Sequence, residues 1–252
     1  MKTSQDRAEW VRRFHPSSTA AARLVCFPHA GGSACYFFPV SKALSPAIDV
    51  VCLQYPGRQE RRKDPCLDAV DAFAAHVAEA LVPWADRPLV FFGHSLGAVI
   101  AFETARRLQA AGTDIAGLFA SGRRGPTTVR DERVHLQPDD GLVAELRKLA
   151  GTDVSLLGDE EILRMILPAI RSDYRAAETY TYTAGEVLRC PITAMVGDSD
   201  EKVTVAEART WQQHTTGPFE LTVFPGGHFY LNHHQQEILA AISALVDGIV
   251  SK

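Results

Sequence analysis

Residues 88–100 read Pro-Leu-Val-Phe-Phe-Gly-His-Ser-Leu-Gly-Ala-Val-Ile, and the rest of the fold is expected to be arranged around them. A short apolar run typical of a β-strand ends in Gly-His-Ser-Leu-Gly, and a helical segment follows at once and ends near Gly112. A serine on so sharp a turn from strand to helix holds strained backbone angles. Gly93 and Gly97 leave room for the two backbones to approach closely. We therefore expect Ser95 to protrude from the edge of a sheet, at the positive end of a helix.

The composition is that of a globular protein with a sizeable core. The chain has 252 residues, of which 46% are hydrophobic and 22% charged. This length suits one large α/β domain, and we predict that residues 1–252 form a single domain with one insertion. The net charge of −4 and the pI near 6.1 lack the basic footprint of a protein that binds nucleic acid.

Neither a membrane segment nor a metal site is predicted. No stretch approaches the roughly 18 consecutive apolar residues of a membrane span. The charged start of the chain lacks the apolar core of a secretory signal, so we expect a cytoplasmic protein. The five cysteines include no Cys-x-x-Cys pair, which indicates neither a disulfide framework nor a zinc site, and we expect no cofactor. Cys26, Cys52 and Cys190 are expected to pack as small core residues.

Strand-like and helix-like segments alternate along most of the chain. Besides the strand before Ser95, β-rich segments are predicted at residues 23–27, 48–55, 115–121, 191–200 and 219–224. Helical periodicity marks residues 67–84 and 232–250. This alternation is typical of the α/β class, with a mostly parallel sheet and helices on both faces.

The alternation breaks between about residues 122 and 186. Two amphipathic helices are predicted there, at residues 140–149 and 160–167, with no strand between them. We interpret residues 122–186 as a helical insertion that covers the carboxyl edge of the sheet as a lid. Its apolar positions either pack the helices on one another, which is the more common role, or line a passage for an apolar substrate. They are Leu142, Val143, Leu146, Leu149, Ile162, Met165 and Ile166.

A serine nucleophile needs a general base, usually a histidine oriented by a carboxylate. With a serine on this type of turn, the order along the chain is serine, acid, histidine. His228 lies in a Gly-Gly-His turn after the last predicted strand, and we expect it to be the base for Ser95. The competing histidines are His29, His94, His233 and His234.

Two aspartates follow a predicted strand at the right place for the acid. Asp198 is nearer the strand, where an aspartate commonly bonds the backbone of its own turn. Asp200 lies further into the loop, and we favour it as the group that orients His228 and stabilises the imidazolium.

Acyl transfer also needs two N–H donors for the oxyanion that develops in the transition state. One is expected to be the backbone N–H of Leu96, the residue after the serine. The other is expected in the Pro-His-Ala-Gly-Gly loop that follows the strand at residues 23–27, at Ala30.

Five motifs occur in order over nearly the whole chain. They are Phe-Pro-His-Ala-Gly-Gly at 27–32, Tyr-Pro-Gly-Arg at 55–58, Gly-His-Ser-Leu-Gly-Ala at 93–98, Gly-Asp-Ser-Asp at 197–200 and Gly-His-Phe at 227–229. Together they resemble the type II, or editing, thioesterases associated with polyketide and nonribosomal peptide synthases. Gly-x-Ser-x-Gly alone signifies only the α/β-hydrolase superfamily, and the first two motifs narrow the resemblance.

The resemblance implies an α/β-hydrolase fold and hydrolysis of acyl groups from the phosphopantetheine thiol of an acyl carrier protein or peptidyl carrier protein. Such hydrolysis frees stalled synthases of aberrant short acyl chains. By the same resemblance, Ser95 takes the acyl group, Asp200 and His228 complete the triad, and the insertion is a mobile lid. We expect a monomer.

Three alternatives stay open. An esterase or lipase acting on oxygen esters, and a thioesterase that releases a full-length product, form the same acyl-serine, so the triad does not separate them. A hydrolase-like binding protein without turnover is disfavoured, because the serine, the acid, the histidine and both glycine loops are all present.

A small basic cluster follows the Tyr-Pro-Gly turn and consists of Arg58, Arg61, Arg62 and Lys63. A charge run of this kind is usually a solvated surface. The alternative is attraction to an acidic carrier protein or to the pantetheine phosphate, which salt would weaken.

Overall fold

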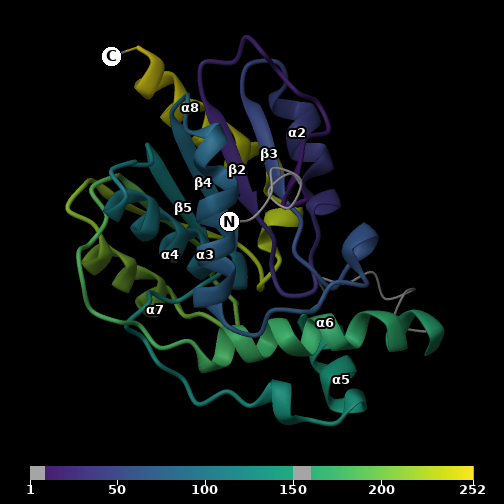
Figure 1. Cartoon of the computed structure of the whole chain (residues 1–252). Coiled ribbons are helices and arrows are strands. Elements are labelled where there is room, and N and C mark those ends of the chain that lie inside the picture. The colour runs from purple at the N-terminus through teal and green to yellow at the C-terminus, as the bar shows by residue number, and fades with distance from the viewer. Residues whose placement is uncertain (1–8, 150–159, 252) are drawn as a thin grey trace.

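A computed structural model describes residues 9–149 and 160–251, and within them the chain forms one seven-stranded sheet (Figure 1). The strand order is β1-β3-β2-β4-β5-β6-β7. Only β1 (Val11–Arg12) is antiparallel to its neighbour, β3 (Asp49–Leu53). The parallel strands are β2 (Arg23–Phe27), β3, β4 (Leu89–His94), β5 (Gly117–Ser121), β6 (Ile192–Gly197) and β7 (Phe219–Phe224). The predicted mostly parallel sheet is confirmed.

Helices cover both faces of the sheet. On one face, α3 (Val70–Leu81) and α4 (Leu96–Ala110) pack on side chains such as Val25 and Phe91. On the other, α2 (Phe38–Leu44) and α8 (Gln235–Val250) pack on the alternate side chains, such as Leu24 and Val90. Successive strand residues point to opposite faces, and every residue of β2, β3, β4 and β5 is buried, so the sequences of these strands are mostly apolar. In the described parts of the chain, no helix has the length and apolar character to cross a membrane.

Two elements were not predicted. The antiparallel strand β1 is only two residues long, too short for any sequence pattern, and it is held at the edge by burial of Trp10 and Val11 against the core. Helix α2 is seven residues long and carries Pro39 in its first turn, where the missing N–H of proline removes no helical hydrogen bond. The short helix α7 (Val205–Arg209) and the 3₁₀ helix Thr210–His214 follow β6.

The segment between β5 and β6 contains α5 (Asp139–Leu149) and α6 (Glu160–Thr179), which lie across one end of the sheet (Figure 1). Both helices were predicted, but the predicted end of the second at residue 167 is wrong. The helix continues through Pro168, because Leu167, Ile170 and Tyr174 share an apolar face with α5. Tertiary packing therefore outweighs the cost of one proline.

The carboxyl ends of five parallel strands converge on one edge of the sheet. The loop after β2 carries Ala30, the turn after β4 carries Ser95, and Arg123 follows β5. Asp200 follows β6 and His228 follows β7. In open α/β sheets this edge is where ligands bind.

Candidate active site

The turn at Ser95 has the strained geometry that the sequence predicts. Ser95 holds φ 54° and ψ −118°, a conformation that a side chain rarely adopts. A Cβ on Gly93 would lie 2.3 Å from the carbonyl oxygen of Gly97, and a Cβ on Gly97 would lie 2.1 Å from that of Phe27. Only glycine fits at both positions. The Ser95 N–H donates to the carbonyl of Ser121 at 2.8 Å, which ties the turn to the end of β5.

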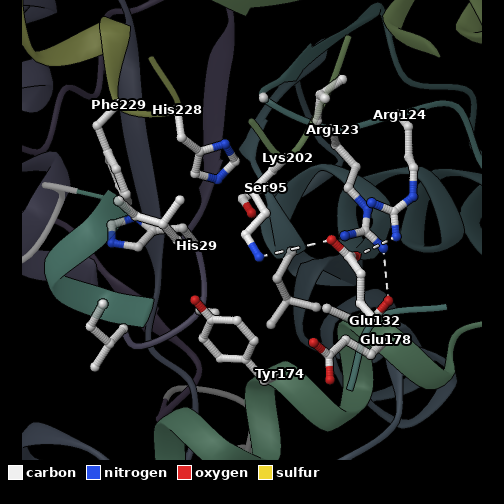
Figure 2. Close-up of a pocket in the computed structure, with 17 residues that line it drawn as sticks. His29, Ser95, Arg123, Arg124, Glu132, Tyr174, Glu178, Lys202, His228 and Phe229 are labelled. Atoms are coloured by element: carbon white, nitrogen blue, oxygen red, sulfur yellow. Dashed lines mark hydrogen bonds and ion pairs between the residues drawn. The ribbon is translucent and has the colours of Figure 1, made fainter. Parts of the chain in front are cut away.

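His228 and Asp200 lie within hydrogen-bonding distance of each other. His228 Nδ1 is 2.9 Å from Asp200 Oδ2, and both side chains are buried. The other carboxylate oxygen of Asp200 accepts the Lys202 N–H at 2.8 Å, which fixes the plane of the carboxylate. With the Nδ1 proton donated to Asp200, Nε2 of His228 is free to accept a proton. Figure 2 shows the His228 ring beside the Ser95 side chain in the cavity that both line.

Asp198 has a different environment. Its carboxylate is exposed and accepts the Gly226 N–H at 3.0 Å and the Ser199 hydroxyl at 2.8 Å. The bond from Gly226 lowers the pKa of the Asp198 carboxyl. It is Asp200, not Asp198, that bonds His228.

Leu96 and Ala30 line the same cavity as Ser95. Leu96 is the first residue of α4, where backbone N–H groups have no partner within the helix. Ala30 lies in the loop after β2, whose next amide, that of Gly31, donates to Asp173 on α6 at 2.7 Å. Both residues thus lie beside Ser95 in this cavity.

Two further histidines pack around His228. His94 is buried, with its ring centroid 5.0 Å from that of His228, and its Nδ1 lies 2.9 Å from Ser121 Oγ. Ser121 Oγ in turn lies 2.6 Å from the Tyr230 hydroxyl. Burial lowers the pKa of His94 well below its usual range and that of His29 to about 3, so both are neutral at physiological pH. They form a neutral wall behind His228.

The remaining histidine candidates lie outside this group. His233 is exposed, and His234 caps the start of α8, where its ring nitrogens face Pro225 O at 3.1 Å and Glu237 at 3.2 Å. Neither is among the residues that line the cavity.

One wall of the cavity is charged, which the sequence analysis missed (Figure 2). Arg124 donates to Glu132 at 2.6 Å, and the Lys202 ammonium lies 3.8 Å from the same carboxylate. Arg123 donates to the carbonyl of Ala177 on α6 at 2.8 Å, and burial, together with Arg124, lowers its pKa to about 10. These two arginines could have been predicted from their position in the sequence, because Arg123 and Arg124 closely follow β5, whose carboxyl end lies at the site.

The cavity has a volume of about 50 Å³, room for a few water molecules. Leu146 and Leu149 of α5 and Tyr174 of α6 close it from the side of the insertion. The more common of the two expected roles, packing of the helices on one another, is confirmed for three of the apolar insertion positions. Leu142, Val143 and Leu146 pack in the cluster between the helices, Leu146 and Leu149 line the cavity, and Met165 is 56% exposed.

The basic cluster after the Tyr-Pro-Gly turn divides into two parts. Arg58 is buried and pairs with Asp173, and the mostly buried Arg61 pairs with Asp64, so the interpretation of a solvated surface is wrong for Arg58 and Arg61. Both arginines are therefore engaged in ion pairs within the protein. Arg62 and Lys63 are exposed.

Comparison with known proteins assigns this arrangement to a family. A model of the thioesterase domain matches residues 22–246, which spans all the residues described above except the edge strand β1 and the last turn of α8. The chain belongs to the thioesterase family. The family match over residues 22–246 agrees with the resemblance to type II thioesterases that the five motifs indicate.

Two relatives of this thioesterase come from Streptomyces species. It is 54% identical over 236 residues to a probable cadicidin biosynthesis thioesterase of Streptomyces griseus, covering 94% of this chain but only 65% of that relative. It is 51% identical over 240 residues to the thioesterase PikA5 of Streptomyces venezuelae, covering 94% of this chain and 85% of that one.

A solved structure confirms the predicted α/β-hydrolase fold. The thioesterase superposes with a TM-score of 0.90 on the type II thioesterase BorB from the borrelidin biosynthetic cluster, at 49% identity. The match covers 94% of this chain and 98% of BorB.

Proposed function

We propose that this chain is a type II thioesterase that hydrolyses acyl groups from the phosphopantetheine arm of carrier proteins on polyketide or nonribosomal peptide synthases. The observation that carries the proposal is the cavity in which Ser95, Leu96, Ala30 and His228 meet, with His228 bonded to Asp200. Membership of the thioesterase family indicates that the bond hydrolysed is a thioester. The biosynthetic context of the relatives supports a carrier-bound substrate.

In the acylation step, His228 Nε2 takes the proton of the Ser95 hydroxyl as Oγ attacks the thioester carbonyl carbon. The carbonyl oxygen becomes an oxyanion that accepts hydrogen bonds from the N–H groups of Leu96 and Ala30. The C–S bond then breaks, and His228 returns the proton to the departing sulfur. The products are a free phosphopantetheine thiol and an acyl ester on Ser95.

In the deacylation step, a water molecule takes the place of the thiol. His228 removes a proton from the water as its oxygen attacks the ester, and the same two N–H groups hold the second oxyanion. Collapse of this intermediate returns the proton to Ser95 Oγ and releases the carboxylic acid. Asp200 stabilises the imidazolium in both steps without taking up its proton.

We assign residues 122–186 the role of a lid over this site. A cavity of about 50 Å³ does not hold an acyl group together with the end of a phosphopantetheine arm. Leu146 and Leu149 of α5 line it on the side of the insertion. Substrate entry is therefore assigned to movement of α5, while α6 stays bonded to the loop after β2 through Asp173.

We assign carrier docking to a surface groove beside α6. A groove of about 450 Å³ lies there, lined by Gly31, by the exposed Arg62 and by the exposed Met165. Lys63 adds a second exposed cation next to it. An acidic carrier surface would complement these charges, and Gly31 adjoins Ala30 in the cavity.

The test is hydrolysis of carrier proteins loaded with a series of acyl chains, with Ser95→Ala as the control. The wild-type enzyme is expected to release the acyl group, and Ser95→Ala to lose at least about 10³-fold of that rate. Exposure to a serine-directed phosphonate should add its mass to Ser95 in the wild-type protein.

Three outcomes would contradict the proposal. Wild-type turnover in Ser95→Ala would reject the mechanism. Faster hydrolysis of a p-nitrophenyl oxygen ester than of acyl-carrier at equal concentration would favour an esterase. Preference for a full-length product chain over short acyl groups would favour a product-releasing enzyme.

A further inference from the structure

We infer that Arg58 and Asp173 are positioning residues that fix the oxyanion loop, residues 29–32, to the lid helix α6. The inference rests on the proposed function, because it concerns the Ala30 donor. Asp173 Oδ2 accepts the Gly31 N–H at 2.7 Å and Arg58 Nη1 at 2.6 Å. Asp173 Oδ1 accepts Arg58 Nη2 at 2.9 Å, so the guanidinium and the carboxylate form two nearly parallel bonds.

Arg58 holds the other side of the same loop. Its Nη1 also donates to the carbonyl of Gly32 at 3.2 Å, and its Nε donates to the carbonyl of Pro56 at 3.2 Å. The guanidinium carbon lies 5.6 Å from the centre of the Tyr55 ring. Arg58 therefore joins three segments: the loop after β3, the oxyanion loop and, through Asp173, the lid.

Helix α6 also contacts the loop through a second residue. Gly31 holds φ +76°, and a Cβ there would lie 3.0 Å from Ile170 Cγ1. Ile170 and Asp173 are three residues apart and lie on one face of the helix. The lid helix thus packs directly on the backbone of the oxyanion loop, in addition to bonding it.

The bond from Gly31 restrains the backbone on one side of the Ala30 amide. Asp173 takes the Gly31 N–H, which fixes the peptide plane between Ala30 and Gly31. Ala30, and not Gly31, is the neighbour of Ser95 in the cavity. The Ala30 N–H belongs to the preceding peptide, which joins this one at the Ala30 Cα. A shift of α6 would carry Asp173 away and release the Ala30–Gly31 peptide, so the position of the Ala30 donor depends on the lid helix.

Burial makes the pair sensitive to change. Asp173 is fully buried, and the Arg58 side chain is 8% exposed. Removing one charge leaves the other buried without compensation, which costs stability in any protein. A test must therefore separate this general cost from an effect on the oxyanion.

The test compares three variants by kinetics and melting temperature. Asp173→Asn keeps an oxygen for the Gly31 N–H but removes the charge. The double variant Arg58→Met with Asp173→Leu removes both charges at similar volume, so it leaves none unpaired. The control, Asp49→Asn, removes the charge of another fully buried aspartate, which pairs with Arg13 and Arg23 at the amino end of β3. It reports the cost of a broken buried pair remote from the site.

The readouts are kcat and KM for the N-acetylcysteamine thioester of acetate, and inhibition by a trifluoromethyl ketone that forms a tetrahedral adduct on serine. Both site variants are expected to lose about 10–100-fold in kcat with KM changed less than about 3-fold, since outright loss of an oxyanion donor costs on the order of 10²–10³. Their affinity for the ketone should fall by the same factor. Asp49→Asn should lose melting temperature but keep kcat within about 2-fold.

Several results would overturn the inference. One is a kcat for the two site variants that matches that of Asp49→Asn at equal loss of melting temperature. Another is a fall in kcat without weaker binding of the ketone. If Asp173→Asn does not fold, the double variant decides by the same criteria. A wild-type enzyme that fails to hydrolyse the thioester refutes the proposed function instead.

Discussion

Replacement of Gly97 by alanine would test the turn geometry that places Ser95. The added Cβ would lie 2.1 Å from the carbonyl oxygen of Phe27 and 2.7 Å from that of Pro28. To reach an ordinary contact of 3.4 Å, the strand end and the helix must separate by about 1.3 Å. Both neighbours are backbone atoms at the start of the loop that carries Ala30, so no side chain can move aside instead.

The expected result has a stability part and a rate part. Overpacking of this kind costs about 1–3 kcal/mol, which corresponds to a fall in melting temperature of about 2–12 °C for a chain of this size. A displacement of about 1 Å between Ala30 and Ser95 is expected to lower kcat by about 10²-fold. Thermal melting and hydrolysis of a small acetyl thioester measure the two.

Gly248→Ala is the matched control. A Cβ there meets no atom within 4 Å, and the residue lies within helix α8. Alanine should raise stability by about 0.5–1 kcal/mol and leave kcat unchanged. A Gly97→Ala enzyme with wild-type kcat would refute the claim that close approach of strand and helix positions the nucleophile.

Three further predictions concern the acid, the docking surface and pH. Asp200→Asn should lower kcat by about 10⁴-fold, and Asp198→Asn only several-fold; equal losses would remove the special role of Asp200. Joint charge reversal at Arg62 and Lys63 should raise KM for acyl-carrier at low salt but not for a small thioester, with the effect fading as salt increases; equal effects on both substrates would exclude docking there. Burial lowers the pKa of His214 from 6.5 to about 4. The neutral imidazole therefore stabilises the fold fully above about pH 6.5. This stabilisation is lost as the pH falls toward 4, at up to about 1.4 kcal/mol per pH unit. His214→Phe should therefore flatten the loss seen by urea unfolding between pH 7 and pH 5, and an unchanged slope would contradict the assignment.

The features that could be predicted from the sequence have local determinants. The turn at Ser95 needs a strand, two glycines and a helix, all within about 20 residues, and the structure has each of them. The meeting of His228 and Asp200 followed from strand order, since parallel strands deliver their following loops to one edge. Which of Asp198 and Asp200 bonds His228 depends on the turn after β6, in which the Asp198 carboxylate accepts the Gly226 N–H instead.

The features that were missed depend on partners far away in the chain. Arg58 looked like part of a surface charge run because its partner, Asp173, is 115 residues away. The extension of α6 past Pro168 depends on packing against α5, which no local pattern shows. The surroundings of His94 could not be predicted either. The Ser121 hydroxyl beside its Nδ1 and the Tyr230 hydroxyl beside Ser121 come from different elements.

The pairing of Arg58 with Asp173 bears on how such enzymes can be recombined. A chimera that replaces residues 122–186 with the lid of a relative would exchange the walls of the acyl cavity, an attractive route to altered substrate range. The same exchange removes the partner of a cation that stays behind in the body of the enzyme. A graft that retains an aspartate at position 173 keeps the Arg58 charge compensated and the Gly31 N–H bonded. The lid can therefore be exchanged as a module only if the incoming lid carries that aspartate.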